Sequence, residues 1–255
     1  MRGPLAILTW LAALGAAAGF GAAPAGLNTK LDRLVAAYPD FLRGHDGAWL
    51  RLKDGRRLPI SDGRTDKSFD AMIEHPDIDD MFFADYPAGA DATAPPENFD
   101  PGRVRYAPLF DAMYGDCRTG AVAAKLRRVA WLPRHRGGDV EITTVNGVDR
   151  QLQAVIAELD ALPERDMVYL IPSSGSYNCR AVAGSAAPSA HGWGIAIDLN
   201  SAAAEYWRWS GAGWHTRVPV EIARIFERHG FIWGGRWRHY DTMHFEYRPE
   251  LIAPR

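Results

Sequence analysis

Two short motifs contain the residue types that bind a catalytic metal ion. The first covers residues 189–198 (Ser-Ala-His-Gly-Trp-Gly-Ile-Ala-Ile-Asp), and the second covers residues 241–246 (Asp-Thr-Met-His-Phe-Glu). They offer two imidazoles and one carboxylate as ligands, from His191, Asp198 and His244. A catalytic zinc site needs three protein ligands, an open position for water and a nearby base. The sequence supplies all of them, since a second carboxylate stands three residues before the last imidazole.

Taken singly, these residues also have structural interpretations. His244 could be a hydrogen-bonded core histidine, Asp198 could form a structural salt bridge, and Asp241 could be a turn residue or a cap. A carboxylate inside an apolar strand carries a large desolvation cost unless a cation or hydrogen-bond donors compensate it. We therefore interpret Asp198 as a ligand, and Asp241 as a base that takes a proton from the bound water.

Three further residues near the motifs are candidates for supporting roles. Arg180 follows residues 177–179 in a Ser/Gly-rich loop, where it could stabilise the negative tetrahedral species of carbonyl hydrolysis; the alternative is an ordinary surface arginine. Ser189 could donate to a substrate carboxylate or amide, or only shape the turn before His191. By strand alternation Glu246 shares a face with His244, where it can orient that ligand.

Composition favours a soluble, exported protein. Of 255 residues, 47% are hydrophobic and 24% charged, with a net charge of −2, so no concentrated basic face and no nucleic-acid partner are expected. Residues 1–25 resemble a secretory signal: Arg2 precedes an apolar run over residues 5–18 and then small residues. That run is shorter than the roughly 20 residues of a spanning helix, so a membrane anchor is the less favoured alternative. After signal cleavage we expect no stable membrane span, and a periplasmic or cell-envelope location.

Export also affects the two cysteines. In an oxidising compartment Cys117 and Cys179 form one possible disulfide, which would tie the central segment to the loop before the first motif. Two free buried thiols are the alternative.

The pattern of apolar residues predicts short elements around the motifs. We expect helices over residues 27–42, 149–162 and 219–229, and mainly helical structure over residues 102–128, with residues 125–128 on a solvated helix face. We expect a hairpin over residues 49–58 and a long loop over residues 85–101. The predicted strands cover residues 129–132, 140–145, 167–171, 195–199, 231–233 and 243–247. A regular β-α-β alternation is lacking, which favours an α+β fold, a small antiparallel sheet with flanking helices. We divide the chain into a signal (1–25), an N-terminal helical and loop region packed on the core (26–128), and a catalytic domain (129–255).

The two motifs, together with residues 177–180 (Tyr-Asn-Cys-Arg), resemble the M15 metallopeptidases, the D-Ala-D-Ala carboxypeptidase or VanY-like family, over about residues 140–251. The resemblance implies the fold shared by these peptidases and the hedgehog signalling domain. It also implies one Zn²⁺ held by His191, Asp198 and His244, with Asp241 as the general base and Arg180 as the arginine that steadies the transition state.

The resemblance predicts an exported zinc peptidase that hydrolyses peptidoglycan stem peptides. At the position that matches Asp241, the L-alanyl-D-glutamate endopeptidases also carry aspartate, whereas the vancomycin-resistance dipeptidases carry glutamate. The scissile bond and the oligomeric state stay open. One alternative is a catalytically inactive, zinc-stabilised module that binds the cell wall. Another is a serine hydrolase built on Ser173, Ser174 or Ser176, although these serines lack the Gly-x-Ser-x-Gly elbow.

Overall fold

The protein is described by a computed structural model that covers residues 25–182, 184, 187–211 and 213–253. The predicted signal therefore lies outside the described residues, apart from its last position. Within the described ranges, no helix combines the length and the apolar character that crossing a bilayer requires. The helices are α1 (Ala25–Ala37), α2 (Phe69–Glu74), α3 (Ala107–Tyr114), α4 (Val148–Leu159), α5 (Met167–Leu170) and α6 (Val220–Arg228).

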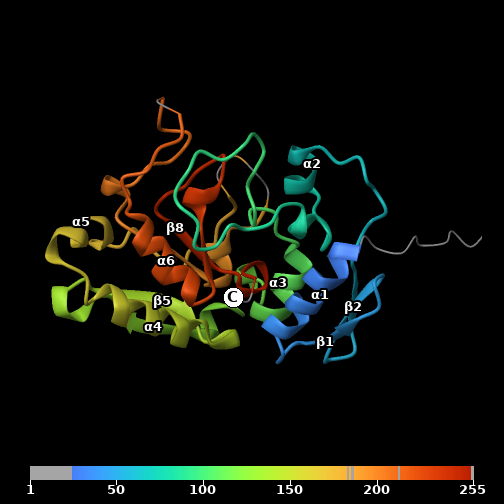
Figure 1. The fold of residues 1–255 in the computed structure, drawn as a ribbon. Helices are drawn as coiled ribbons and strands as arrows, with labels where there is room; N and C mark the ends of the chain where they lie inside the picture. The colour runs from blue at the N-terminus through green and yellow to red at the C-terminus, as the bar shows by residue number, and fades with distance from the viewer. Residues whose placement is uncertain (1–24, 183, 185–186, 212, 254–255) are drawn as a thin grey trace, which may run out of the picture.

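In the part of the chain that the structure describes, eight strands form three small antiparallel sheets (Figure 1). The N-terminal sheet has the order β1-β2-β3, a two-stranded sheet pairs β4 with β5, and the C-terminal sheet has the order β6-β8-β7. The strands are β1 (Leu42–His45), β2 (Trp49–Leu52), β3 (Arg57–Pro59), β4 (Leu126–Ala130), β5 (Asp139–Thr143), β6 (Ala196–Asp198), β7 (Phe231–Trp233) and β8 (His244–Tyr247). This mixture of helices and small antiparallel sheets confirms the predicted α+β class.

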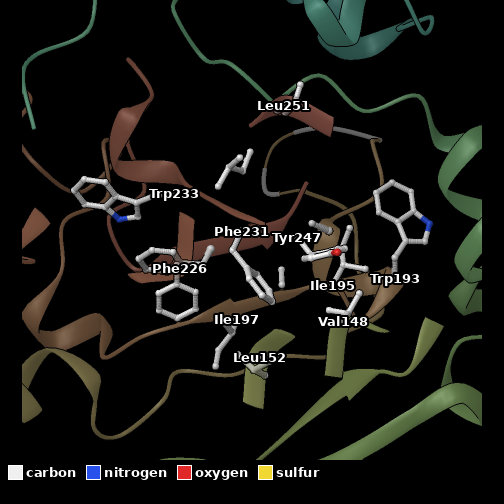
Figure 2. Close-up of a cluster of buried hydrophobic side chains, with 14 of the residues drawn as sticks. Val148, Leu152, Trp193, Ile195, Ile197, Phe226, Phe231, Trp233, Tyr247 and Leu251 are labelled. Carbon is white, nitrogen blue, oxygen red and sulfur yellow. The ribbon is translucent and has the colours of Figure 1, made fainter. Parts of the chain in front are cut away.

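The central strand β8 is buried on both faces and carries apolar side chains on one face and polar side chains on the other. Phe245 and Tyr247 point to the apolar side, where Phe226 of α6 stacks on Phe245 with ring centroids 3.9 Å apart. Figure 2 shows this core, which α4, α6 and the turn around Trp193 complete. The alternate residues of β8 are polar, because strand side chains alternate between faces. The core therefore fixes the strand that carries the polar motif.

The N-terminal region packs directly on the C-terminal sheet. Helix α1 contacts the 3₁₀ turn Pro249–Leu251 that follows β8. Phe110 of α3 stacks on Trp193 with ring centroids 4.7 Å apart, and the Trp193 indole N–H donates to Asp111 at 2.7 Å. The aromatic residue between the two motif glycines is thus held by a helix more than 70 residues upstream.

Several predicted elements are confirmed with shifted ends, and two are wrong. Helices α1, α4 and α6, the hairpin β2–β3, the loop over 85–101 and the three strands of the C-terminal sheet lie where expected. Residues 167–171, predicted as a strand, form α5, because the preceding 3₁₀ turn at Glu164–Asp166 continues into helix until Pro172 stops it. Residues 125–128 are not a helix face: a 3₁₀ turn ends at Lys125 and β4 begins at Leu126, so the exposed arginines there lie on a strand.

Candidate metal centre and active site

The three predicted ligands come from three segments that meet at the end of the β6–β8 pair. His191 lies in a 3₁₀ turn, Asp198 is the last residue of β6, and His244 is the first residue of β8. Asp198 and His244 are direct partners in the antiparallel register, so their side chains emerge on the same face. The ligand atoms of all three residues lie within 4.8 Å of one another.

The turn that carries His191 is fixed at both ends. The Ser189 hydroxyl accepts a hydrogen bond from the His191 backbone N–H at 3.4 Å. Gly194 ends the turn with a φ of +66°, and a Cβ there would lie 2.8 Å from the Leu126 side chain. A larger residue at Gly194 would therefore be both strained and crowded. Ser189 shapes the turn, one of the two roles considered for it, and it also lines the cavity in front of the turn.

Hydrogen bonds behind each imidazole leave one ring nitrogen facing the centre. His191 Nδ1 contacts the Ser176 carbonyl, and His244 Nε2 lies 3.1 Å from a carboxylate oxygen of Glu246. Because both partners are acceptors, each of these nitrogens carries the ring proton. In the neutral rings, His191 Nε2 and His244 Nδ1 then present lone pairs, the arrangement found in metal-binding histidines.

The facing atoms form a nearly equilateral triangle. The Oδ1 atom of Asp198 lies 3.2 Å from His191 Nε2 and 3.0 Å from His244 Nδ1, and the two nitrogens are 3.2 Å apart. Ligands bound at about 2.1 Å in a tetrahedral geometry are about 3.4 Å apart. Two lone pairs this close repel unless a proton or a cation lies between them. The donor set therefore fits a divalent ion such as Zn²⁺.

The charges of the triangle are mutually dependent. Burial opposes ionisation of Asp198, but the His191 and His244 imidazoles outweigh it and hold the Asp198 pKa well below its usual range. Burial likewise opposes a charge on His244, yet hydrogen bonds to Asp198 and Glu246 raise its pKa to about 10. Without a metal ion, a proton on His244 thus fills the role of the cation.

Asp241 lies in the cavity of about 300 Å³ that the three ligands line. Among the described residues, its Oδ1 atom is buried and has no hydrogen-bond partner. Burial, and next the charge of Asp198, raise the Asp241 pKa to about 6. A carboxyl group whose pKa is brought toward neutrality can accept and return protons, which is the property of a general base.

Glu246 is fully buried and holds His244 in place. Its carboxylate accepts hydrogen bonds from Arg105 Nε at 3.0 Å and from Arg248 Nη1 at 3.0 Å. Burial opposes its ionisation, but these cations and His244 hold its pKa well below the usual range. A charged Glu246 keeps the proton on the far nitrogen of His244, so Glu246 orients the His244 ring, and the two residues share a face, as strand alternation predicts.

Arg180 lies at the exposed rim of the same cavity. Among the described residues, its guanidinium makes one long hydrogen bond, 3.4 Å, to the Ala181 carbonyl. The neighbouring Cys179 is joined to Cys117 by a disulfide, with Cα atoms 5.6 Å apart. The predicted pairing is therefore present, and it anchors the start of the loop that carries Arg180.

The cavity also contains residues that sequence reasoning missed or left aside. Arg103 and Arg105 come from the segment before α3, and His239 and Trp207 complete the wall. Asp100 fixes this wall, since it accepts the His239 backbone N–H at 2.9 Å. The alternation of Arg103, buried Val104 and Arg105 was the available signal, but nothing local indicated which distant residues they face.

The three serines of the serine-hydrolase hypothesis make structural hydrogen bonds. The Ser173 hydroxyl donates to the Asp198 carbonyl at 3.1 Å, and the Ser174 and Ser176 hydroxyls accept the backbone N–H groups of Ser201 and Glu141, both at 2.9 Å. None of the three lines the cavity that holds the ligands and Asp241.

Comparison with known proteins gives one finding. A family model of the M15 peptidases, described as D-alanyl-D-alanine carboxypeptidase, matches residues 183–247, about a quarter of the chain. No curated protein and no solved structure matches the chain. The matched segment contains all three ligands and Asp241, whereas Arg103 and Arg180 lie before it. The predicted resemblance is thereby confirmed: residues 183–247 match the M15 peptidase family.

Proposed function

We propose that the protein is an exported zinc-dependent peptidase that hydrolyses peptide bonds in peptidoglycan stem peptides. The observation that carries the proposal is the meeting of two features in one cavity. Three lone-pair donors form a triangle of the size that a tetrahedral ion needs, and beside it stands the Asp241 carboxylate, whose Oδ1 atom is buried and has no hydrogen-bond partner among the described residues. The M15 match supports the peptidase class and a peptidoglycan-related substrate.

In this proposal His191, Asp198 and His244 hold one Zn²⁺. When bound, such an ion lowers the pKa of a coordinated water toward neutrality and polarises a carbonyl oxygen. Asp241 accepts the proton of the attacking water and returns it to the amine that leaves, since its raised pKa suits both transfers. Arg180 donates from the rim to the oxygen that becomes negative as the carbonyl carbon turns tetrahedral.

Three further points belong to the proposal. The signal-like residues 1–25 support export to the periplasm or cell envelope, where the substrate lies. The helix-flanked β6-β8-β7 sheet, with ligands on paired strands, supports the hedgehog/DD-peptidase-like fold. The scissile bond is either D-Ala-D-Ala, as the description of the matching family suggests, or L-Ala-D-Glu, as the aspartate at position 241 suggests.

The test is mass analysis of muropeptides digested by the zinc-loaded protein, beside a chelated control and the Asp241→Ala variant. We expect cleavage by the loaded wild type only, with zinc still bound to Asp241→Ala. Loss of a general base lowers the rate by about 10²- to 10⁴-fold. If the wild type binds peptidoglycan and retains zinc but releases no new amino termini, the protein is the zinc-stabilised binding module instead.

A further inference from the structure

Arg103 stands at the junction of two cavities in the active-site cleft. It lines both the cavity of about 300 Å³ that contains the ligands and a neighbouring one of about 210 Å³. Its side chain is only 17% exposed. The segment that carries it lies outside the family match, so its role does not come with the resemblance.

The guanidinium of Arg103 is hydrogen-bonded to Asp100, but this bond does not use all of its N–H donors. Its Nη1 atom donates to Asp100 at 3.2 Å, which is its hydrogen-bond partner among the described residues. Buried Arg236 offers a contrast: it donates to both oxygens of Glu227, at 2.6 and 3.2 Å, and to a backbone carbonyl. A nearly buried guanidinium has five donors in a rigid fork that matches a carboxylate. Arg103 therefore has donors for an anionic ligand.

The wall around Arg103 keeps this fork in place. Asp100 also accepts the His239 backbone N–H, and the His239 ring packs edge-on against Trp207 with centroids 4.7 Å apart. The guanidinium carbon lies 6.0 Å from the Trp207 ring centre. Arg103 and Asp241 line the same cavity, so the guanidinium and the carboxylate face one space.

We infer that Arg103 binds a carboxylate carried by the substrate residue that follows the scissile bond. The inference rests on the proposed function, in which Asp241 returns its proton to the leaving amine. A cation near Asp241 thus lies on the side of the leaving residue. Bidentate arginine–carboxylate contacts are among the stronger hydrogen bonds and fix orientation as well as affinity.

In stem peptides such a carboxylate has two sources. One is the C-terminal carboxylate of a terminal D-Ala, and the other is the α-carboxylate of a D-Glu that is linked onward through its side chain. Both present the same planar anion next to the leaving nitrogen. The experiment therefore uses two peptide pairs, acyl-D-Ala-D-Ala and L-Ala-γ-D-Glu, each with the carboxylate free or converted to the amide.

We expect the zinc-loaded wild type to prefer the free carboxylate in one of the two pairs, which identifies the source. Arg103→Gln should lower kcat/KM by about 10- to 100-fold more for that peptide than for its amide, mainly through KM. Arg103→Lys keeps the charge but loses the fork, so its preference should be intermediate. Arg165→Gln, a surface arginine that is 83% exposed, is the control for loss of one charge. Calorimetry with chelated protein should show the same loss of peptide binding.

Two results would overturn the inference: an equal loss for carboxylate and amide in Arg103→Gln, or loss of the preference in Arg208→Gln, which lines only the neighbouring cavity. Should Arg103→Gln fail to fold, Arg103→Lys decides, since an unchanged preference there counts against a bidentate contact. If the wild type cleaves neither pair, the proposed function fails. Calorimetric binding of the peptides to the wild type and to Arg103→Gln then decides whether Arg103 binds the carboxylate.

Discussion

Asp198 contributes the one negative charge that the three-ligand set offers to a cation. Replacing it by asparagine keeps the shape and removes the charge. We expect Asp198→Asn to lower zinc affinity by more than about 100-fold, the upper end of what outer-shell partners contribute. Competition with a chromogenic chelator measures this affinity. Asp241→Asn, which changes a carboxylate in the same cavity, should bind zinc like the wild type, and equal losses in both variants would remove Asp198 from the ligand set.

His244 couples metal binding to pH. In the metal-free protein its pKa of about 10 keeps it protonated at neutral pH, whereas a metal ligand must be neutral. Each bound ion therefore displaces a proton, and acid favours the metal-free form. We expect the apparent zinc affinity to rise by about tenfold per pH unit between about pH 6 and pH 8. Calorimetry in buffers with different ionisation heats counts the protons, and a count of zero would contradict this picture.

The elements that carry the site were predictable where side-chain alternation and length agree. Ile195 and Ile197 alternate with Ala196 and Asp198 as the residues of a strand do, and β6 covers Ala196–Asp198. The apolar run at residues 167–171 is equally short but forms α5, because a run of four or five apolar residues has no period of its own. Its structure is decided by the preceding 3₁₀ turn and the proline that follows. Elements of this length need their tertiary neighbours to be assigned.

The disulfide acts at the scale of elements, because it joins the 3₁₀ turn after α3 to the loop that carries Arg180. It links residues 62 apart in the sequence. A loop of that length restricts the unfolded chain enough to contribute about 4 kcal/mol. We expect the double variant Cys117→Ser/Cys179→Ser to melt at a clearly lower temperature in circular dichroism. Reduced wild type should match it, and an unchanged transition would mean that α3 and the loop hold together without the bond.

Buried charged residues from the N-terminal and C-terminal halves of the sequence belong to one hydrogen-bonded network. A continuous chain of hydrogen bonds runs from Tyr38, the residue after α1, through Glu250, Arg248 and Glu246 to His244. Sequence reasoning found His244 and Glu246 at its end. It could not find Arg105, whose partner Glu246 lies 141 residues away, since no local pattern encodes a pairing over that distance. The N-terminal region in this sense supports the candidate metal site.

Because the two halves of the sequence share this network, we expect that residues 129–255, the predicted catalytic domain, do not fold on their own. Cutting it out removes Arg105 from Glu246, Tyr38 from Glu250, and the α3 partners of Trp193. Breaking one buried charge pair costs about 3–5 kcal/mol, which is comparable to the 5–15 kcal/mol of a typical domain. We expect the fragment to show neither a cooperative thermal transition nor stoichiometric zinc binding, whereas residues 25–255 show both. Cooperative melting of the fragment with wild-type zinc affinity would instead establish two separable domains and reduce the N-terminal region to a supplier of the cleft wall.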